Sequence, residues 1–160
     1  DCGCCGDRNM NIDFQDCLVA YHRHGIRFAD PDIWEITEEV DGGDVLITVT
    51  SSETCFWTLR ILPGCPPPPQ AVESCVEAFQ EEYDDVEAEE PDASLAEMPA
   101  CSRNLTFFCM ELMNSVGLRS VRTMNFTLLA WWQGTHHELA EAQPMIDHMT
   151  NSVRIDSLMG

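Results

Sequence analysis

Hydrophobic and polar residues alternate along much of this chain with a period of two, which is typical of β-strands that bury one face. The segment TCFWTLRIL (54–62) is the clearest case, because Trp57, Leu59 and Ile61 fall on the same face. Similar segments at 34–40 and 45–50 flank the turn Asp41-Gly42-Gly43, so we expect a hairpin there.

A helical period replaces this alternation in the segment QAVESCVEAFQEEY (70–83). Apolar residues recur there at spacings of three and four, which places on one stripe Val72, Cys75, Val76, Phe79 and Tyr83. The preceding run PGCPPPP ends the strand before it, since proline cannot join a central ladder. Its last prolines suit the first turn of a helix, where the missing N–H has no cost.

Two long alternating segments follow, at 104–113 and 121–132, and we expect them to pair across NSVG (114–117). The second contains the adjacent pair Trp131-Trp132, whose rings point to opposite faces of a strand. Its alternate positions predict one shared face made of Met124, Phe126, Leu128, Ala130 and Trp132. We therefore expect both tryptophans to pack in covered cores rather than on a ligand.

A second helix is expected near the end of the chain, with Pro144 in its first turn. Strands, one helix, strands and a final helix follow in that order, which favours an α+β domain: an antiparallel β-sheet with helices packed on it, as an α/β/α sandwich. We divide the chain into a cysteine-rich lead-in at 1–19 and a single domain at 20–160.

The chain of 160 residues has a net charge of −20, with 28 acidic residues against eight bases, all of them arginine. This charge repels nucleic acid and anionic lipid, and it attracts cationic partners. We therefore expect no nucleic acid and no membrane as partner, and a basic protein surface as the partner that fits. The acidic run at 81–92 lacks the turn glycine of a calcium loop, so we interpret it as a solvated loop or an edge strand.

Nine cysteines are an odd number, and a domain of this length can build a core without disulfides. We therefore expect a reducing compartment and a cytoplasmic location. No signal peptide is visible, although a cleaved one would leave no trace. Because the first residue is Asp1 rather than methionine, we also expect processing or trimming of the chain.

Three segments resemble the PsbP-like fold family, which includes extrinsic subunits of photosystem II, a Ran-binding nuclear import factor and many bacterial domains. They are GIRFADPDIWEI (25–36), FWTLRILPGCPPPP (56–69) and the final strand and helix at 126–155, with Ile146, Met149 and Ser152 in the closing pattern. The resemblance spans about residues 20–155. It implies a sheet between helices and a role in binding or assembly, with no common active site. The start at 1–17 departs from it.

The segment DCGCCG at the start of the chain is the main candidate for chemistry. Cys2, Cys4 and Cys5 are close enough to share a metal, and a fourth ligand for zinc is Cys17, or a histidine of YHRHG (21–25). The Cys-x₂-Cys pairs of most structural zinc sites are absent, so a loose soft-metal site, a redox role and an inert tail stay open.

The histidines elsewhere do not form a known catalytic motif. His136 and His137 are adjacent, whereas the metalloprotease arrangement separates two histidines by four positions on a helix. His22 and His24 share a face in an extended segment but lack a third ligand. We find no nucleophile elbow, and a P-loop lysine is impossible in a chain without lysine.

These observations favour a binding or assembly module that is not an enzyme and has no certain cofactor. The alternative is a thiolate zinc domain built from the N-terminal cysteines, with an enzyme that uses a cysteine or histidine ranked last. A metal analysis distinguishes the first two, because only the second predicts stoichiometric zinc.

Overall fold

The computed structural model of the protein describes residues 19–31, 33–52 and 54–156. Its main element is a seven-stranded sheet with the strand order β3-β4-β5-β11-β10-β9-β6, in which every neighbouring pair is antiparallel. The strands are β3 (Glu35–Asp41), β4 (Asp44–Ser52), β5 (Cys55–Leu62), β6 (Glu87–Glu89), β9 (Cys101–Cys109), β10 (Leu112–Arg122) and β11 (Thr127–Thr135). The sheet therefore ends in two edge strands, β3 and β6.

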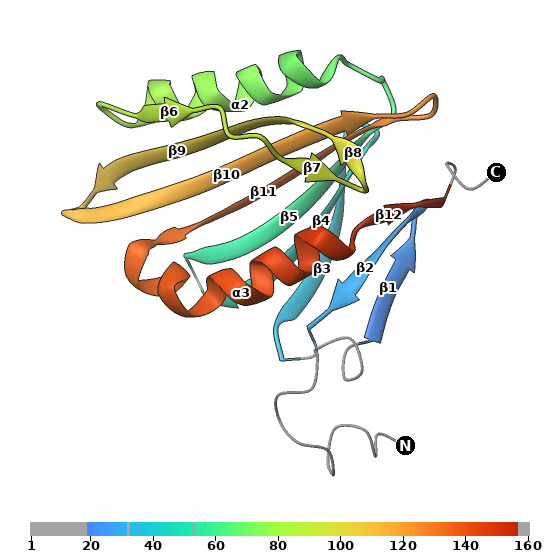
Figure 1. The fold of residues 1–160 in the computed structure, drawn as a ribbon, viewed down its shortest axis with the longest axis horizontal. Helices are drawn as coiled ribbons and strands as arrows, with labels where there is room; N and C mark the ends of the chain where they lie inside the picture. Colours follow the sequence, from blue (N-terminus) through green and yellow to red (C-terminus); the bar gives the residue numbers. More distant parts are fainter. Residues whose placement is uncertain (1–18, 32, 53, 157–160) are drawn as a thin grey trace, which may run out of the picture.

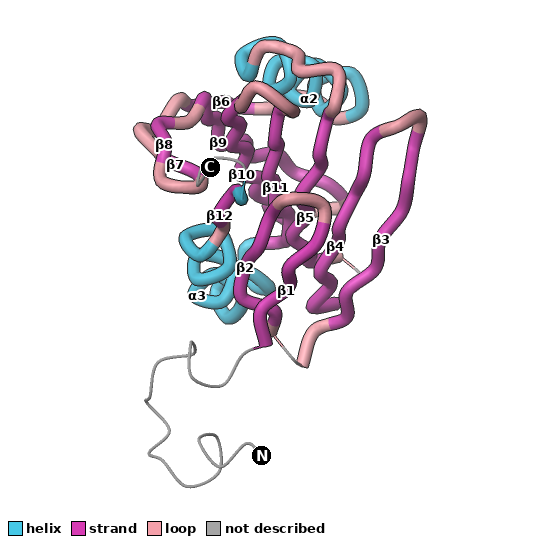
Figure 2. Tube along the Cα trace, turned by 90° about the vertical axis from the view of Figure 1, so that its right-hand side faces the viewer, coloured by secondary structure: helices cyan, strands magenta, loops and turns pink. Residues whose placement is uncertain are grey.

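A smaller sheet lies beside the main one, with the order β1-β2-β12 (Figure 2). It is formed by β1 (Val19–Arg23), β2 (Ile26–Asp30) and β12 (Arg154–Ile155). A short hairpin of β7 (Ser94–Leu95) and β8 (Met98–Pro99) forms a third sheet. Because β12 pairs with β2, the end of the described chain returns to its beginning (Figure 1).

Two helices lie on opposite faces of the main sheet (Figure 1): α2 (Pro68–Glu82) and α3 (His136–Ser152). The strand alternation separates two cores, because neighbouring residues of β11 face opposite sides. Leu128, Ala130 and Trp132 pack with α3 and the small sheet, whereas Leu129 and Trp131 pack with α2. This arrangement confirms the expected α/β/α sandwich. Trp132 lies in a covered core as expected, whereas Trp131 packs on the α2 side but remains partly exposed.

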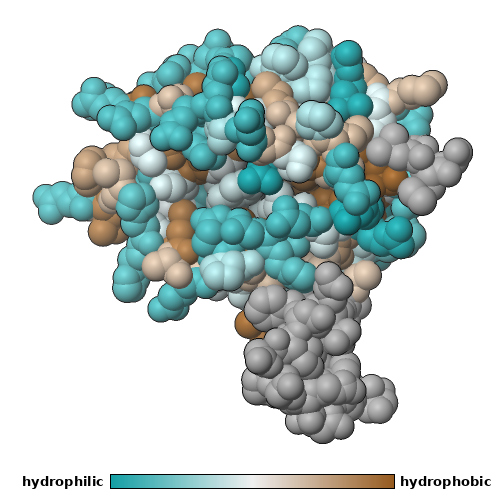
Figure 3. Space-filling view, in the orientation of Figure 1, coloured by the Kyte–Doolittle hydropathy of each residue, from teal (hydrophilic) through white to brown (hydrophobic). Residues whose placement is uncertain are grey.

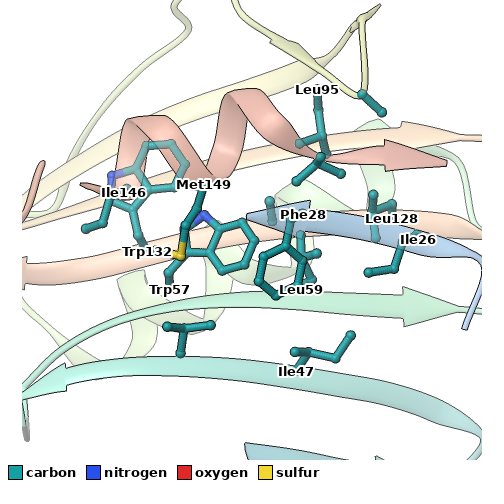
Figure 4. Close-up of a cluster of buried hydrophobic side chains, with 14 of the residues drawn as sticks. Ile26, Phe28, Ile47, Trp57, Leu59, Leu95, Leu128, Trp132, Ile146 and Met149 are labelled. Atoms are coloured by element: carbon teal, nitrogen blue, oxygen red, sulfur yellow. The ribbon is translucent and has the colours of Figure 1, made fainter. Parts of the chain in front are cut away.

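The core under α3 is the larger one (Figure 4). Trp57, Leu59 and Ile61 of β5 all lie in it, as their spacing predicts, and Phe28 packs edge-on against Trp57 with the ring centroids 4.8 Å apart. The indole N–H of Trp57 donates to the Thr150 hydroxyl at 2.9 Å. This hydrogen bond joins the sheet to α3 inside the core.

The helix α2 also forms as its apolar stripe predicts. Val72 and Val76 are buried, and Phe79 and Tyr83 pack beside them on Phe107 of β9. Prolines occupy the first helical positions, where their missing N–H groups need no partner. The acidic run after α2 contains the edge strand β6, in which every residue is exposed.

The region after residue 100 differs from its prediction, because it contains three strands rather than two. NSVG (114–117) lies inside β10, and the chain turns instead at Met110 and Glu111. Both turn residues have positive φ, 54° and 66°, a backbone region that glycine usually marks in a sequence. Met124 also lies in a turn, 95% exposed, and not on the face of β11.

The start of α3 was also wrong in the prediction, because the helix begins two turns before Pro144. Thr135 caps it: its hydroxyl accepts from the backbone N–H of Glu138, and the Glu138 carboxylate accepts from the backbone N–H of Thr135. This capping box fixes the first turn. Leu139 and Ala142 then bury against the sheet, which offsets the hydrogen bond that Pro144 removes.

Candidate functional site

The helix α2 covers only part of its face of the sheet. It packs on β9, β10 and β11, while β3 and β4 extend to one side of it (Figure 2). On the α2 side, the strands β4, β5 and β11 present a set of side chains that we call the open face: Thr48, Thr50, Phe56, Thr58, Arg60 and Trp131. All of them except Thr58 are partly exposed.

Hydroxyl and aromatic groups lie in rows across the open face, because residues in register share a face. One row runs from Thr37 through Thr48 and Thr58 to Trp131. The hydroxyls of Thr48 and Thr58 are 3.2 Å apart, within hydrogen-bond distance. Phe56 in the next row meets Trp131 edge to face, with ring centroids 6.4 Å apart.

A hollow of about 270 Å³ separates the open face from the first half of α2. Leu62, Leu129 and Trp131 form its apolar part, while Gln70 and Ser74 of α2 line the opposite side. An apolar hollow with a few polar groups is the usual form of a binding site. The sequence holds a weak signal for it, since the same alternation that buries one face of β5 places polar residues on the other.

Two ionisable side chains reach this hollow, and neither is reactive. Arg60 donates to the Asp44 carboxylate at 3.0 and 2.8 Å, so its charge is balanced within the protein. Burial raises the pKa of the Cys75 thiol, which keeps the thiol protonated and a poor nucleophile.

Carboxylates border the open face on both sides. Glu35 and Glu39 of β3 are exposed and stand in the same rows as Thr50 and Leu46. On α2, Glu77 and Glu81 are exposed and continue the helical stripe of Ser74, which lines the hollow. These carboxylates give both borders of the open face a negative potential.

The predicted metal ligands Cys2, Cys4, Cys5 and Cys17 lie outside the described residues. Within residues 19–31, 33–52 and 54–156, no group of three or more histidine, cysteine or acidic side chains is placed to hold a metal ion. The described cysteines, at positions 55, 65, 75, 101 and 109, carry free thiols. Zinc thus has no site in this part of the chain.

The histidines noted in the sequence have separate partners. His22 contacts Asp156 at 2.7 Å and His24 contacts Glu38 at 3.3 Å, so the pair YHRHG does not converge on one point. His136 contacts the Ser115 hydroxyl at 2.9 Å, and His137 lies exposed in the first turn of α3. The structure does not bring any of them together.

Three exposed apolar side chains lie together at one end of the molecule, around the turn between β9 and β10 (Figure 3). Phe108, Met110 and Leu112 are 63%, 89% and 54% exposed. Elsewhere the face shown in Figure 3 is mainly hydrophilic. Neither of the described helices has the length and apolar character needed to cross a membrane.

No protein-family model and no curated protein sequence matches the chain. Solved structures that are similar to it in fold include the following two. Cyanobacterial PsbP from Synechocystis has a TM-score of 0.55 at 12% identity, over 86% of this chain and 92% of its own. LpqN, involved in cell envelope biogenesis of Mycobacterium tuberculosis, has a TM-score of 0.50 at 12% identity, over 92% of this chain and 99% of its own.

Identities this low carry information about the fold and none about a shared activity. The two matches cover 86% and 92% of this chain. The chain has a PsbP-like fold.

Proposed function

We propose that this protein is a binding or assembly module, not an enzyme, and that it holds a partner with a basic surface on the open face. The observation that carries the proposal is the position of the hollow between two acidic borders. Glu35 and Glu39 lie on one side of the hollow, and Glu77 and Glu81 lie on the other.

The chemistry of the open face suits a partner that presents arginine or lysine next to an apolar side chain. Phe56 and Trp131 offer ring surface to such a side chain, and Thr48 and Thr50 offer hydroxyls at the rim. Aromatic rings at the centre with charges at the rim are a common arrangement in protein interfaces. The carboxylates mainly speed encounter and select the sign of the partner's charge.

The absence of a reactive group at the hollow supports the non-enzymatic part of the proposal. Catalysis by a thiol needs a lowered pKa, and burial shifts the pKa of Cys75 in the other direction. Arg60 is already held by Asp44 and Asp41, so it is not available to stabilise a developing negative charge.

A peptide titration tests the proposal directly. The probe is a synthetic peptide that alternates arginine and tryptophan, followed by NMR through the backbone amides of Thr48 and Thr58 and the indole N–H of Trp131. We expect saturable shifts at these positions that weaken as salt is raised. The double variant E35Q/E39Q should lower the affinity roughly two- to thirtyfold, since exposed charge pairs contribute about 0.2–1 kcal/mol each.

The matched control is E111Q/E141Q, which removes the same charge at exposed positions outside the open face. The proposal requires the control to bind the peptide as the unmodified protein does. Equal losses in both variants would show that only net charge matters, and the open face would not be a site. A natural partner would then be a basic protein that binds E35Q/E39Q more weakly than it binds E111Q/E141Q.

Zinc binding by Cys2, Cys4, Cys5 and Cys17 stays a prediction of the sequence. Metal content per chain tests it, on protein purified under reducing conditions without added metal. About one zinc per chain, lost in the C4S/C5S variant, would support it. A metal-free protein with nearly nine reactive thiols after denaturation would contradict it.

A further inference from the structure

The small sheet carries a row of basic side chains across its outer face. His22 of β1 stands opposite Arg27 of β2, and Arg27 stands opposite Arg154 of β12. Residues directly opposite one another in antiparallel strands point to the same side of the sheet. Two arginines in this relation repel each other, which destabilises the sheet unless negative charge lies between them.

Apart from Arg27, each described arginine has a partner that balances its charge or accepts a hydrogen bond from it. Carboxylates pair with Arg23, Arg60, Arg103 and Arg154, while Arg119 lies over the ring of Trp132 and Arg122 donates to the Cys65 carbonyl. Arg27 differs from them, since no ion pair joins it to a carboxylate within the described ranges. This is unexpected in a chain with 28 acidic residues.

Arg154 is only partly engaged. Its Nη1 donates to the carbonyls of Asn151 and Val153 at 2.9 and 2.8 Å, which covers the negative end of α3. Its Nη2 lies 3.4 Å from the carboxylate of Glu97, whose side chain is 72% exposed. A contact this long at such an exposed carboxylate leaves donor capacity for a ligand.

A hollow of about 340 Å³ opens beside these two arginines, between the small sheet and the last turns of α3. Ala20 and Ala29 form its floor, and their short side chains leave the space open. His148 and Asn151 of α3 line the wall. The wall is fixed to the floor, because the backbone N–H of Ala29 donates to the Ser152 hydroxyl at 2.8 Å.

We propose that this hollow binds a small organic molecule through an oxyanion, either phosphate or carboxylate, held between Arg27 and Arg154. Guanidinium groups match both oxyanions because their N–H donors form a planar fork. The side-chain amide of Asn151 adds a neutral donor at the wall. The hollow exceeds the size of an inorganic ion, so the rest of the ligand lies over Ala20 and Ala29.

The net charge of the protein does not prevent this binding. Charges separated by more than about 8 Å are largely screened at physiological ionic strength, so the nearest side chains decide the local potential. The site differs from the open face in position and in sign of charge. Its failure would leave the proposed function untouched, and the reverse also holds.

The test uses the full chain and two probes, inorganic phosphate and acetate, titrated separately at constant ionic strength with chloride as the balancing ion. The backbone amides of Arg27, Ala29 and Arg154 report binding by NMR. We expect saturable shifts with at least one probe, and the probe that saturates first identifies the class of oxyanion. No saturable shift with either probe at about 10 mM would overturn the proposal, since a dissociation constant of 1 mM would give near saturation there.

The variant R27Q should abolish the shifts at Ala29, and the control R122Q should retain them, because Arg122 lies elsewhere and donates to the Cys65 carbonyl. Thermal unfolding provides an independent measurement. Without ligand, R27Q should be as stable as the unmodified protein or more stable, because it removes the repulsion with Arg154. The saturating probe should then raise the melting temperature of the unmodified protein and of R122Q, but not that of R27Q. A melting temperature of R27Q that rises equally would contradict the site.

Discussion

The indole of Trp132 lies directly over Gly117, its cross-strand neighbour in the main sheet. A Cβ atom added at Gly117 would come within 2.2 Å of Cζ2 of Trp132. The glycine therefore serves packing rather than a turn, because its missing side chain leaves room for the ring of Trp132 next to β10. The guanidinium of Arg119 also lies over the ring of Trp132, with its Cζ 5.2 Å from the ring centroid.

Gly117→Ala should destabilise the protein by about 1–3 kcal/mol or more, because Trp132 has to leave its place in the core. Urea unfolding followed by circular dichroism measures the change. Gly64→Ala is the control, since nothing lies within 4 Å of a Cβ atom at Gly64. If both variants lost the same free energy of unfolding, Trp132 would have moved aside without destabilising the protein.

Thr150→Val should lower the free energy of unfolding by about 1–3 kcal/mol, the cost of an unsatisfied buried donor. The reason is the indole N–H of Trp57, which donates to the Thr150 hydroxyl and would lose its acceptor. Thr150→Ser keeps the hydroxyl and is the control. The hydrogen bond would be shown to be unimportant if the valine variant unfolded at the same denaturant concentration as the serine variant.

Pro144→Ala should stabilise the protein, by up to about 3 kcal/mol, because alanine restores a backbone donor inside α3. The side chain of Pro144 is exposed, so its removal leaves no cavity. Thermal unfolding gives the comparison, with Pro63→Ala in an exposed turn as the control. A lower melting temperature for Pro144→Ala than for the control would mean that the ring of Pro144 stabilises α3 by more than the missing donor destabilises it.

Alkaline titration should show both tyrosines of the chain ionising late. Burial raises the pKa of Tyr21, and so does its hydrogen bond to Glu38 at 2.7 Å. Burial also raises the pKa of Tyr83. Since both pKa values are raised in the folded state, their contribution to stability is present below pH 10.0 and is lost as the pH rises above it.

The measurement is tyrosinate absorbance together with circular dichroism. We expect the absorbance of Tyr21 to appear only when the fold is lost, because its folded-state pKa lies far above 10.0. Tyr21→Phe identifies which part of the signal belongs to which ring. Ionisation of Tyr21 at its ordinary pH in a fully folded protein would contradict the role given to Glu38.

The period of two in the sequence predicts most of the strands, because a strand that buries one face alternates apolar and polar residues. Trp57 of β5 and the stripe of α2 are examples. The turn at Met110 and Glu111 could not be predicted in this way, because its positive φ values fall on residues other than glycine. Gly117 led to the wrong prediction of a turn at 114–117, because a glycine usually marks a turn. Here it lies inside β10 and makes room for Trp132.

The candidate sites were less accessible to sequence reasoning than the fold. The open face depends on how far α2 extends over the sheet, which is a property of packing and not of any one segment. The pairing of Arg27 with Arg154 joins positions 127 residues apart through the register of β2 and β12. Neither the coverage of the sheet by α2 nor the pairing of these two arginines produces a recognisable pattern in one segment of the sequence.

Both edges of the main sheet consist of acidic strands. Glu35 and Glu39 are exposed on β3, and Glu87 and Glu89 are exposed on β6. An unpaired strand is a template for another chain, and like charges on both edges oppose that contact. Salt would weaken this protection by screening the charges. Concentrated protein should therefore stay clear longest at low ionic strength, and added salt should bring turbidity before it brings unfolding.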